Sequence, residues 1–429
     1  MGTTPSTTDA EVAAALEPTP DQPSVTKRFI ASYVFLQLAA WTALLTPLSV
    51  TLALRVAELV APENKGAQLG MILSAGAFAA MIGAPVWGAV SDRTRARVGR
   101  RKFWMLAGTT GLLVGLLIVA FAPSIPVMLV GWVLCQLMAN ATQTAILSVM
   151  ADRVPEHQRG TVAGMLGFTL TLGTLLGTGI TTLLAGNLLL SFLVPWLLLP
   201  VGLVLFFRQF RDHPAIKGAL PRFSFGELLR TFWVNPFRHR DYGLAFTSRA
   251  FTIFGTAFFV AFQVYFLTDH LGVGLDVVAA FVFASTFVSA ALTVIVSFGC
   301  GLLSDRVRRR KPFLIAASLS VATGLVLIAT SAGFLQFIVG AGLVAAGRGL
   351  YVAMGVTVTV AVLPDKRKAA NYIGLMQIAN SGPQMLAPAI APLFFAIGAA
   401  GTNYVAGFLI AGAAALVGAL AMIPIRATR

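Results

Sequence analysis

Two short basic stretches hold the charged side chains whose spacing is most regular. The first, GAVSDRTRARVGRRK, runs from Gly88 to Lys102, and the second, GLLSDRVRRRK, runs from Gly301 to Lys311. Each stretch places an aspartate directly before clustered arginines. Carboxylates and guanidinium groups form strong, charge-assisted hydrogen bonds with each other. The chemistry that these residues predict is therefore ion pairing, and neither a nucleophile–base set nor a metal cluster accompanies them.

The two stretches also belong to an internal repeat. The pairs of residues that share an offset of 213 positions are Gly88 with Gly301, Asp92 with Asp305, Arg93 with Arg306, and Asp152 with Asp365. The last two aspartates each end a long apolar run. Landmarks that share one offset indicate a duplicated half.

The composition excludes a soluble protein. Hydrophobic residues make up 57% of the 429 residues and charged residues 11%, and the mean hydropathy is +0.84. Soluble domains carry about 25% charged residues. The net charge of +15 lies in short loops and joins no recognition motif, so a nucleic-acid partner is not expected. Cys135 and Cys300 lie inside apolar runs and predict buried thiols, and the scattered histidines predict no metal site and no cofactor.

Twelve apolar runs approach the length of about 20 residues that a membrane span needs. The predicted spans are 29–54, 67–90, 103–122, 126–150, 161–185, 188–207, 243–268, 277–303, 313–332, 334–361, 372–398 and 403–424. We expect an all-α integral membrane protein with four parts: a disordered cytoplasmic tail (1–26), a first six-helix bundle (27–207), a central cytoplasmic loop (208–242) and a second six-helix bundle (243–425).

The placement of lysine and arginine predicts the orientation. With both chain termini in the cytoplasm, 27 of the 31 basic residues fall on the cytoplasmic side. The exceptions are Arg55, Lys65, Arg249 and Arg348. We therefore expect a protein of the plasma membrane with cytoplasmic termini. Arg55 is expected to pair with Glu58, and Arg249 is expected to reach the inner membrane surface.

The first basic stretch resembles the signature loop of the major facilitator superfamily, in which Gly-x-x-x-Asp-Arg and clustered basic residues follow the second helix. Its longer form, SDRTRARVGRRK, is most similar to the branch of glycoside–cation symporters and sucrose-type carriers. The segment ADRVPEHQRG (151–160) is similar to the same broad group. The resemblance extends over residues 27–426. It implies two pseudo-symmetric six-helix bundles that work as a carrier by alternating access.

In the family that the loop resembles, its aspartate helps to latch the two halves together on the cytoplasmic side. The resemblance implies a conformational latch of Gly88, Asp92, Arg93, Arg100, Arg101, Asp152, Gly301, Asp305, Arg306 and Asp365. We expect Asp92 to accept hydrogen bonds at a neighbouring helix N-terminus, and Arg93 to meet Asp152. These pairs are expected to loosen when the carrier opens inward. Alternatively, the arginines only set the topology.

The resemblance also implies a central cavity lined by the first, fourth, seventh and tenth helices. Polar residues at helical spacing on these helices and the eleventh are the candidates for a solute path. They are Gln37, Trp41, Gln136, Asn140, Thr144, Arg249, Thr256, Gln263, Arg348, Tyr351, Gln377 and Asn380. The alternative for each is a hydrogen bond that only joins two helices.

Arg348 is the most informative candidate, because it lies near the middle of its span and no carboxylate lies near the middle of any span. A charge at that depth should face a cavity or a partner. We expect Arg348 to be hydrated or to contact an anionic or polyol solute. The related symporters use acids on their second and fourth helices, which this chain lacks. A proton is therefore expected rather than sodium if any ion is coupled.

The sequence predicts a monomeric transporter of a small organic solute, with no enzymatic activity. Asn, Gln, Thr, Tyr and Trp side chains suit a sugar-like or otherwise polar solute. Export of amphipathic drugs is an alternative, because Phe251, Phe254, Phe258, Phe259 and Phe262 crowd the seventh span. A receptor or scaffold that binds without transport, derived from a transporter, is a second alternative.

Overall fold

The computed structural model describes residues 24–212, 239–307, 310–363, 369–398 and 402–425, and every regular element in these ranges is a helix. In the first half the helices are α2 (Lys27–Thr46), which continues through the π-helical turn η1 (Pro47–Thr51) into α3 (Leu52–Leu59), α4 (Lys65–Arg93), α5 (Arg100–Phe121), α6 (Ile125–Arg153), α7 (Glu156–Leu183) and α8 (Leu188–Phe207). In the second half they are α10 (Arg240–Tyr265) with the π-helical turn η3 (Phe266–His270), α11 (Val278–Val307), α12 (Lys311–Ala329), α13 (Phe334–Ala361), α14 (Ala369–Phe395) and α15 (Tyr404–Met422).

These helices confirm the expected twelve-span, all-α membrane fold. Within the described residues, eleven helical segments are long and apolar enough to cross a bilayer. The remaining one, α14, has 27 residues, but it carries Gln377, Asn380, Gln384 and three prolines, which lower its hydropathy. The predicted tail (1–26) and central loop (208–242) fall mostly outside the described residues, and the four-part division of the chain stays a prediction. The seventh span begins at Arg240, three residues before the predicted start.

Side chains at the helix starts fix several of the span boundaries. The Thr26 hydroxyl accepts a hydrogen bond from the backbone N–H of Phe29 at the start of α2 (3.2 Å). Asn187 and Asn403 cap α8 and α15 in the same way, each accepting at 3.0 Å from the third residue of its helix. Such caps satisfy N–H groups that a helix leaves without a partner.

The two halves repeat the same packing. In the first half α5 packs on α6, α4 on α6, and α2 on both α7 and α8; in the second half α12 packs on α13, α11 on α13, and α10 on both α14 and α15. The halves meet through α4 with α14 and through α7 with α11. These are equivalent pairs under the same duplication, which is the pseudo-symmetry that the sequence repeat predicts.

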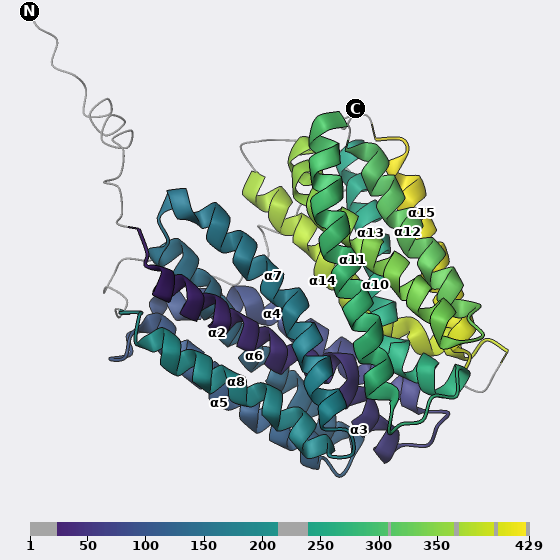
Figure 1. Ribbon diagram of the computed structural model, residues 1–429, viewed down its shortest axis with the longest axis horizontal. Coiled ribbons are helices and arrows are strands. Elements are labelled where there is room, and N and C mark those ends of the chain that lie inside the picture. Colours follow the sequence, from purple (N-terminus) through teal and green to yellow (C-terminus); the bar gives the residue numbers. More distant parts are fainter. Residues whose placement is uncertain (1–23, 213–238, 308–309, 364–368, 399–401, 426–429) are drawn as a thin grey trace, which may run out of the picture.

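The bundles form a V rather than a closed cylinder (Figure 1). We call the end of each bundle that carries Lys27, Arg100, Arg153, Arg240 and Lys311 the basic end, and the opposite end the far end. One buried hydrophobic core runs through the first half and into the far end of the second half, including Phe262, Phe266 and Phe395. A separate core, around Tyr242, Leu314 and Met376, lies at the basic end of the second half. The halves are thus joined at the far end and diverge toward the basic end.

Glycines on α7 let it approach its neighbours closely. A Cβ at Gly177 would collide with the Thr46 hydroxyl of α2, and one at Gly173 would lie 2.8 Å from Trp41 Cβ. Gly179 faces Phe283 of α11, across the boundary between the halves, at 3.2 Å. A Cβ at Gly164, on the same helix, would have no atom of the described residues within 4 Å. Small residues at Gly173 and Gly177 therefore set the spacing of α2 and α7.

We expect Gly177→Ala to destabilise the protein by about 1–3 kcal/mol, because the new methyl group has no space against Thr46. Gly164→Ala is the matched control on the same helix. It should leave stability unchanged or raise it slightly, since alanine is the better helix former. Thermal unfolding of both variants in detergent measures the difference. Equal melting temperatures would contradict the close approach of α2 and α7.

Candidate functional site

The basic end of the first half contains a network of ion pairs centred on Arg101. The Arg101 side chain is 4% exposed. Its guanidinium contacts Asp92 Oδ1 at 2.6 Å and Asp152 Oδ2 at 2.9 Å, and it donates to the Ser91 hydroxyl at 2.9 Å. Arg100 adds a second contact to Asp152 at 3.2 Å. One arginine therefore ties the ends of α4, α5 and α6 together.

A third carboxylate, and not Asp92 as predicted, lies at the N-terminus of a neighbouring helix. Asp212 Oδ2 accepts hydrogen bonds from the backbone N–H groups of Arg101 (2.6 Å) and Lys102 (2.8 Å), at the start of α5. A carboxylate is favourable there because a helix N-terminus carries free donors and positive potential. Asp92 instead pairs with the Arg101 side chain. Sequence reasoning missed Asp212, because this residue follows α8 and is far from the loop in the chain.

The other predicted latch residues divide into two groups. Arg93 donates to the carbonyl oxygen of Ala89, and Gly88 faces Thr144 of α6 with 3.7 Å to a Cβ position. In the second half, Arg306 is exposed, Asp365 lies outside the described residues, and the side chains of Gly301 and Asp305 are not described. The second latch therefore stays a prediction.

The Asp152 pairs are formed although the halves diverge at the basic end. Arg100, Arg101 and Asp152 all belong to the first half. We expected pairs at this end to loosen when the end opens. Contacts within one half need not break when the halves separate, so in this conformation they hold α4, α5 and α6 as one unit.

An ion pair between the halves lies at the far end. Lys65 Nζ, at the start of α4, contacts Asp269 Oδ1 of η3 at 2.5 Å and lies over the Tyr265 ring. The Tyr265 hydroxyl donates to the carbonyl oxygen of Ala53 at 2.9 Å. Next to this pair, a Cβ at Gly70 would collide with the Pro388 carbonyl oxygen of α14. We call Lys65, Asp269, Tyr265 and Ala53 the far gate.

The far end also contains an ion pair that does not join the halves. Arg55 Nη1 contacts Glu58 Oε2 at 2.6 Å, which confirms the expected pair, and Arg55 Nη2 donates to the carbonyl oxygen of Ala122 at 2.9 Å. All of these residues belong to the first half. This pair is therefore a natural control for the far gate.

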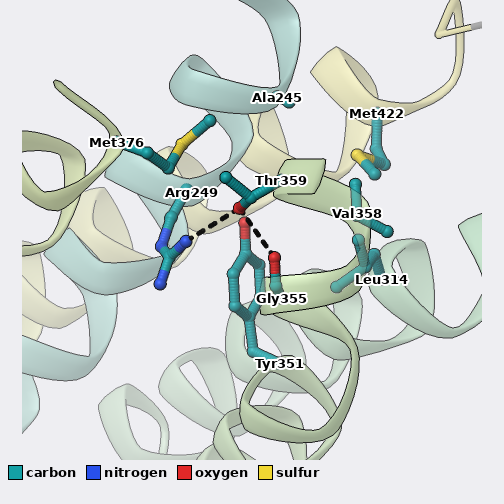
Figure 2. A pocket seen from close by; sticks show the side chains of 9 residues that line it. All are labelled: Ala245, Arg249, Leu314, Tyr351, Gly355, Val358, Thr359, Met376 and Met422. Atoms are coloured by element: carbon teal, nitrogen blue, oxygen red, sulfur yellow. Dashed lines mark hydrogen bonds between the residues drawn. The ribbon is translucent and has the colours of Figure 1, made fainter. Parts of the chain in front are cut away.

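In the second half, four of the predicted path residues come together, with Arg249 at the centre. The Arg249 guanidinium donates to Asn380 Oδ1 of α14 (2.7 Å) and to the Thr359 hydroxyl of α13 (3.2 Å), and it lies over the Tyr351 ring. Asn380 in turn donates to Gln377 Oε1 at 2.7 Å. Figure 2 shows the guanidinium pointing across the pocket toward Thr359, beside the Tyr351 ring. Arg249 therefore points into the bundle, and the expectation that it reaches the membrane surface is wrong.

Thr359 belongs to this cluster and was not among the predicted residues. Tyr351, Gly355 and Thr359 follow one another at intervals of four residues. The Thr359 hydroxyl donates a hydrogen bond to the Gly355 carbonyl oxygen (2.7 Å). This spacing places all three on one face of α13. The same i, i+4 pattern that gave the other candidates could have found Thr359.

The pocket beside Arg249 is small. It is lined by Ala245, Arg249, Leu314, Tyr351, Gly355, Val358, Thr359, Met376 and Met422 (Figure 2). It has space for about one water molecule. Sites for organic ligands are far larger, about 300 Å³ or more. The pocket beside Arg249 is therefore too small to hold an organic solute in this conformation.

Arg348 stands apart from that cluster. It lies near the middle of α13, and its side chain is exposed. It makes no hydrogen bond, ion pair or ring contact with the residues that the structure describes. Its neighbours Gly347 and Gly349 face α12 and α11, so Arg348 lies on the side of α13 that is turned away from these two helices.

The candidates of the first half are more enclosed. Gln37 and Gln136 are buried, and Asn140 donates to the Gln136 carbonyl oxygen at 2.8 Å. Gln37 Oε1 and both side-chain polar atoms of Gln143 lack partners among the described residues. Buried amides normally have partners, so these groups are available to water or a solute. Trp41 packs at Gly173, and Thr144 lies by Gly88.

On α10, Thr256 bonds to its own helix, whereas Gln263 is buried near the far end. Phe258, Phe259 and Phe262 of the same helix form core, whereas Phe251 is exposed. Phe258 packs against Phe262, Phe395 and Phe408 with ring centroids 5.0–5.9 Å apart. This packing removes the main reason for considering amphipathic drugs as the solute.

Comparison with known families gives the class of the protein. The family model of the Major Facilitator Superfamily matches residues 30–299 and 246–429. The chain therefore belongs to the major facilitator superfamily. Comparison with curated proteins gives no significant match.

Solved structures with the same fold are transporters of different solutes. The nucleoside transporter NupG is 15% identical, with a TM-score of 0.71, and the match covers 93% of this chain and 98% of that one. The peptide transporter POT in complex with sulfate is 14% identical, with a TM-score of 0.71 and 97% coverage of both chains. The D-xylose-proton symporter is 15% identical, with a TM-score of 0.66 and coverage of 93% and 97%. At this identity the likeness is one of fold.

We expect Arg101→Gln to destabilise the first half by about 2–4 kcal/mol, because it leaves Asp92 and Asp152 without their shared partner. Arg95→Gln removes the same charge from an exposed position of the same loop and is the control. Thermal unfolding in detergent compares the two variants. A melting temperature for Arg101→Gln equal to that of Arg95→Gln would show that the network contributes nothing.

Removing the far-gate pair should shift the protein toward a state that is open at the far end. Spin labels at Glu63 and Leu275, both exposed, report the far-end distance by pulsed electron resonance. Asp269→Asn should raise the population of the longer distance about fivefold or more, since partly buried pairs between elements contribute about 1 kcal/mol or more. Glu58→Gln is the control, because its pair lies within one half. An unchanged distance distribution in Asp269→Asn argues against a gate.

Proposed function

We propose that this protein carries a small polar organic solute across a membrane by alternating access. The observation that carries the proposal is that the halves share a buried core only at the far end, while the basic end of the second half has a core of its own. The basic ends of two units packed in this way can move apart without breaking a core that they share. Membership of the major facilitator superfamily supports the same conclusion.

The polar character of the solute follows from the side chains available to bind it. Gln37 and Gln143 offer amide groups without partners among the described residues, and Gln377 and Gln384 of α14 carry further amides. Such groups suit hydroxyl and carbonyl groups of a sugar-like molecule. The likeness of the basic loop to the glycoside–cation and sucrose-type branch points the same way. Export of amphipathic drugs has less support, since Phe258 and Phe262 of α10 pack into the core.

The setting of the carrier is part of the proposal. We place it in the plasma membrane with both termini in the cytoplasm, because the basic end carries most of the lysines and arginines. It works as a monomer. Any coupling ion is a proton rather than sodium, because sodium sites in membranes use carboxylates and those of this chain lie at helix ends, in connections and in the N-terminal segment.

Transport by reconstituted protein tests this function and separates it from binding by a receptor. Purified protein in liposomes is supplied with labelled glucose, glucuronate, glucose 6-phosphate, neutral amino acids and tetraphenylphosphonium. We expect saturable uptake of at least one polar solute and none of the lipophilic cation. Uptake of tetraphenylphosphonium alone would favour drug export.

A reversible block at the far gate supplies the control. Lys65→Cys with Asp269→Cys, in a Cys135→Ala/Cys300→Ser background, places two thiols at the gate for a short reducible cross-linker. Cross-linking should stop uptake, and reduction should restore it, since alternating access requires the far end to open. Binding of a solute with no uptake, before or after reduction, would identify a receptor instead.

A further inference from the structure

The orientation of Arg348 is fixed by the glycines on either side of it. A Cβ at Gly347 would collide with the Ala317 carbonyl oxygen of α12, and one at Gly349 would lie 2.8 Å from the Thr293 carbonyl oxygen of α11. The helices α12 and α11 therefore pack against two sides of α13. Arg348 lies between these two sides.

The face that carries Arg348 is the one turned to the interior of the second half. Tyr351 and Gly355, three and seven residues further along, share this face and line the pocket beside Arg249. Val352, one turn from Arg348, is 65% exposed, although it lies in the membrane-spanning part of α13. No described helix therefore covers this part of the Arg348 face.

Among the described residues, no carboxylate lies at this depth. The 16 acidic residues lie in the N-terminal segment, in connections or in the terminal turns of helices. The partners of Arg249 are the neutral side chains of Asn380, Thr359 and Tyr351. A guanidinium keeps its charge under all ordinary conditions. The interior of the second half thus carries two positive charges, with Arg249 nearer the basic end and Arg348 at mid-depth.

We propose that the solute is an organic anion and that Arg348 contacts its carboxylate or phosphate group. This deepens the proposed function and rests on it. An uncompensated cation in a low-dielectric space attracts an anion strongly, and a guanidinium matches both groups with two parallel hydrogen bonds. The three partners of Arg249 are neutral, so they leave its positive charge uncompensated. This charge attracts the anion from the basic end, and Arg348 binds it.

Charge-selective labelling tests the site without knowledge of the solute. Val352→Cys in the Cys135→Ala/Cys300→Ser background places a thiol one turn from Arg348. Its rates of modification by anionic sulfonatoethyl and cationic trimethylammonioethyl methanethiosulfonate are compared, each corrected for reaction with a free thiol. Adding Arg348→Gln should lower the ratio of the anionic to the cationic modification rate about tenfold. The positive charge of Arg348 attracts the anionic reagent and repels the cationic one, so its removal changes the two rates in opposite directions. Arg310→Gln, at the basic end, should leave this ratio within about twofold.

Two further measurements keep the test decisive if Arg348→Gln folds poorly. Arg348→Lys should retain most of the ratio, because it retains the charge. With Arg348 intact, raising the salt concentration from about 10 mM to about 1 M should lower the ratio through screening. The proposal would be overturned if the thiol of Val352→Cys reacted with neither reagent. It would also be overturned if neither Arg348→Gln nor salt changed the ratio of the two modification rates.

The uptake panel then separates this inference from the carrier function. Uptake of glucuronate or glucose 6-phosphate in preference to glucose supports the anion, and the two arms distinguish carboxylate from phosphate. Uptake of glucose with neither anion overturns the inference and leaves the carrier standing. Uptake of no solute contradicts the carrier function, and the inference falls with it.

Discussion

A charge inside a bilayer must be paired, hydrated or bound to a ligand, and this constraint explains most of the arrangement of the chain. The acids lie at helix ends, in connections and in the N-terminal segment, where water can reach them. Two arginines nevertheless stand within the spans of the second half. Arg249 meets the constraint with Asn380, Thr359 and Tyr351, whereas Arg348 is exposed on the face of α13 turned away from α11 and α12. The constraint therefore requires water or a ligand at Arg348.

The ion pairs serve two different purposes in the two ends of the molecule. At the basic end, Arg101 with Asp92 and Asp152 joins helices of one half, so these contacts can persist while the halves move. At the far end, Lys65 and Asp269 join different halves, so this contact must break if the far end opens. A carrier needs both kinds, because rocking requires rigid units and a releasable contact between them. The signature loop is better understood here as part of the rigid unit.

The sequence predicted the fold well because the signals were local or repeated. Apolar runs gave all twelve spans, most of them to within a few residues, and the shared offset of Asp92 with Asp305 gave the two halves. Contacts between distant segments were harder to predict. Nothing near Asp212 in the sequence indicates that it lies at the start of α5, and Lys65 with Asp269 looked like two unrelated charges near the outer ends of spans. The sequence predicted only some members of the Arg249 cluster. Spacing predicts which residues share one face of a helix, but it does not predict which helices are in contact.

The backbone of the first helix in each half departs from α geometry near the far end. The π-helical turn η1 (Pro47–Thr51) interrupts α2–α3, and η3 (Phe266–His270) ends α10, both near the far end. The hydrogen bond from Tyr265 to Ala53 joins residues directly beside these turns, and Asp269 of the far gate belongs to η3. A π-helical turn is a rare departure from α geometry that often marks a functional position. The contact that closes the far end is therefore built beside two π-helical turns, where we expect the backbone to adjust when it opens.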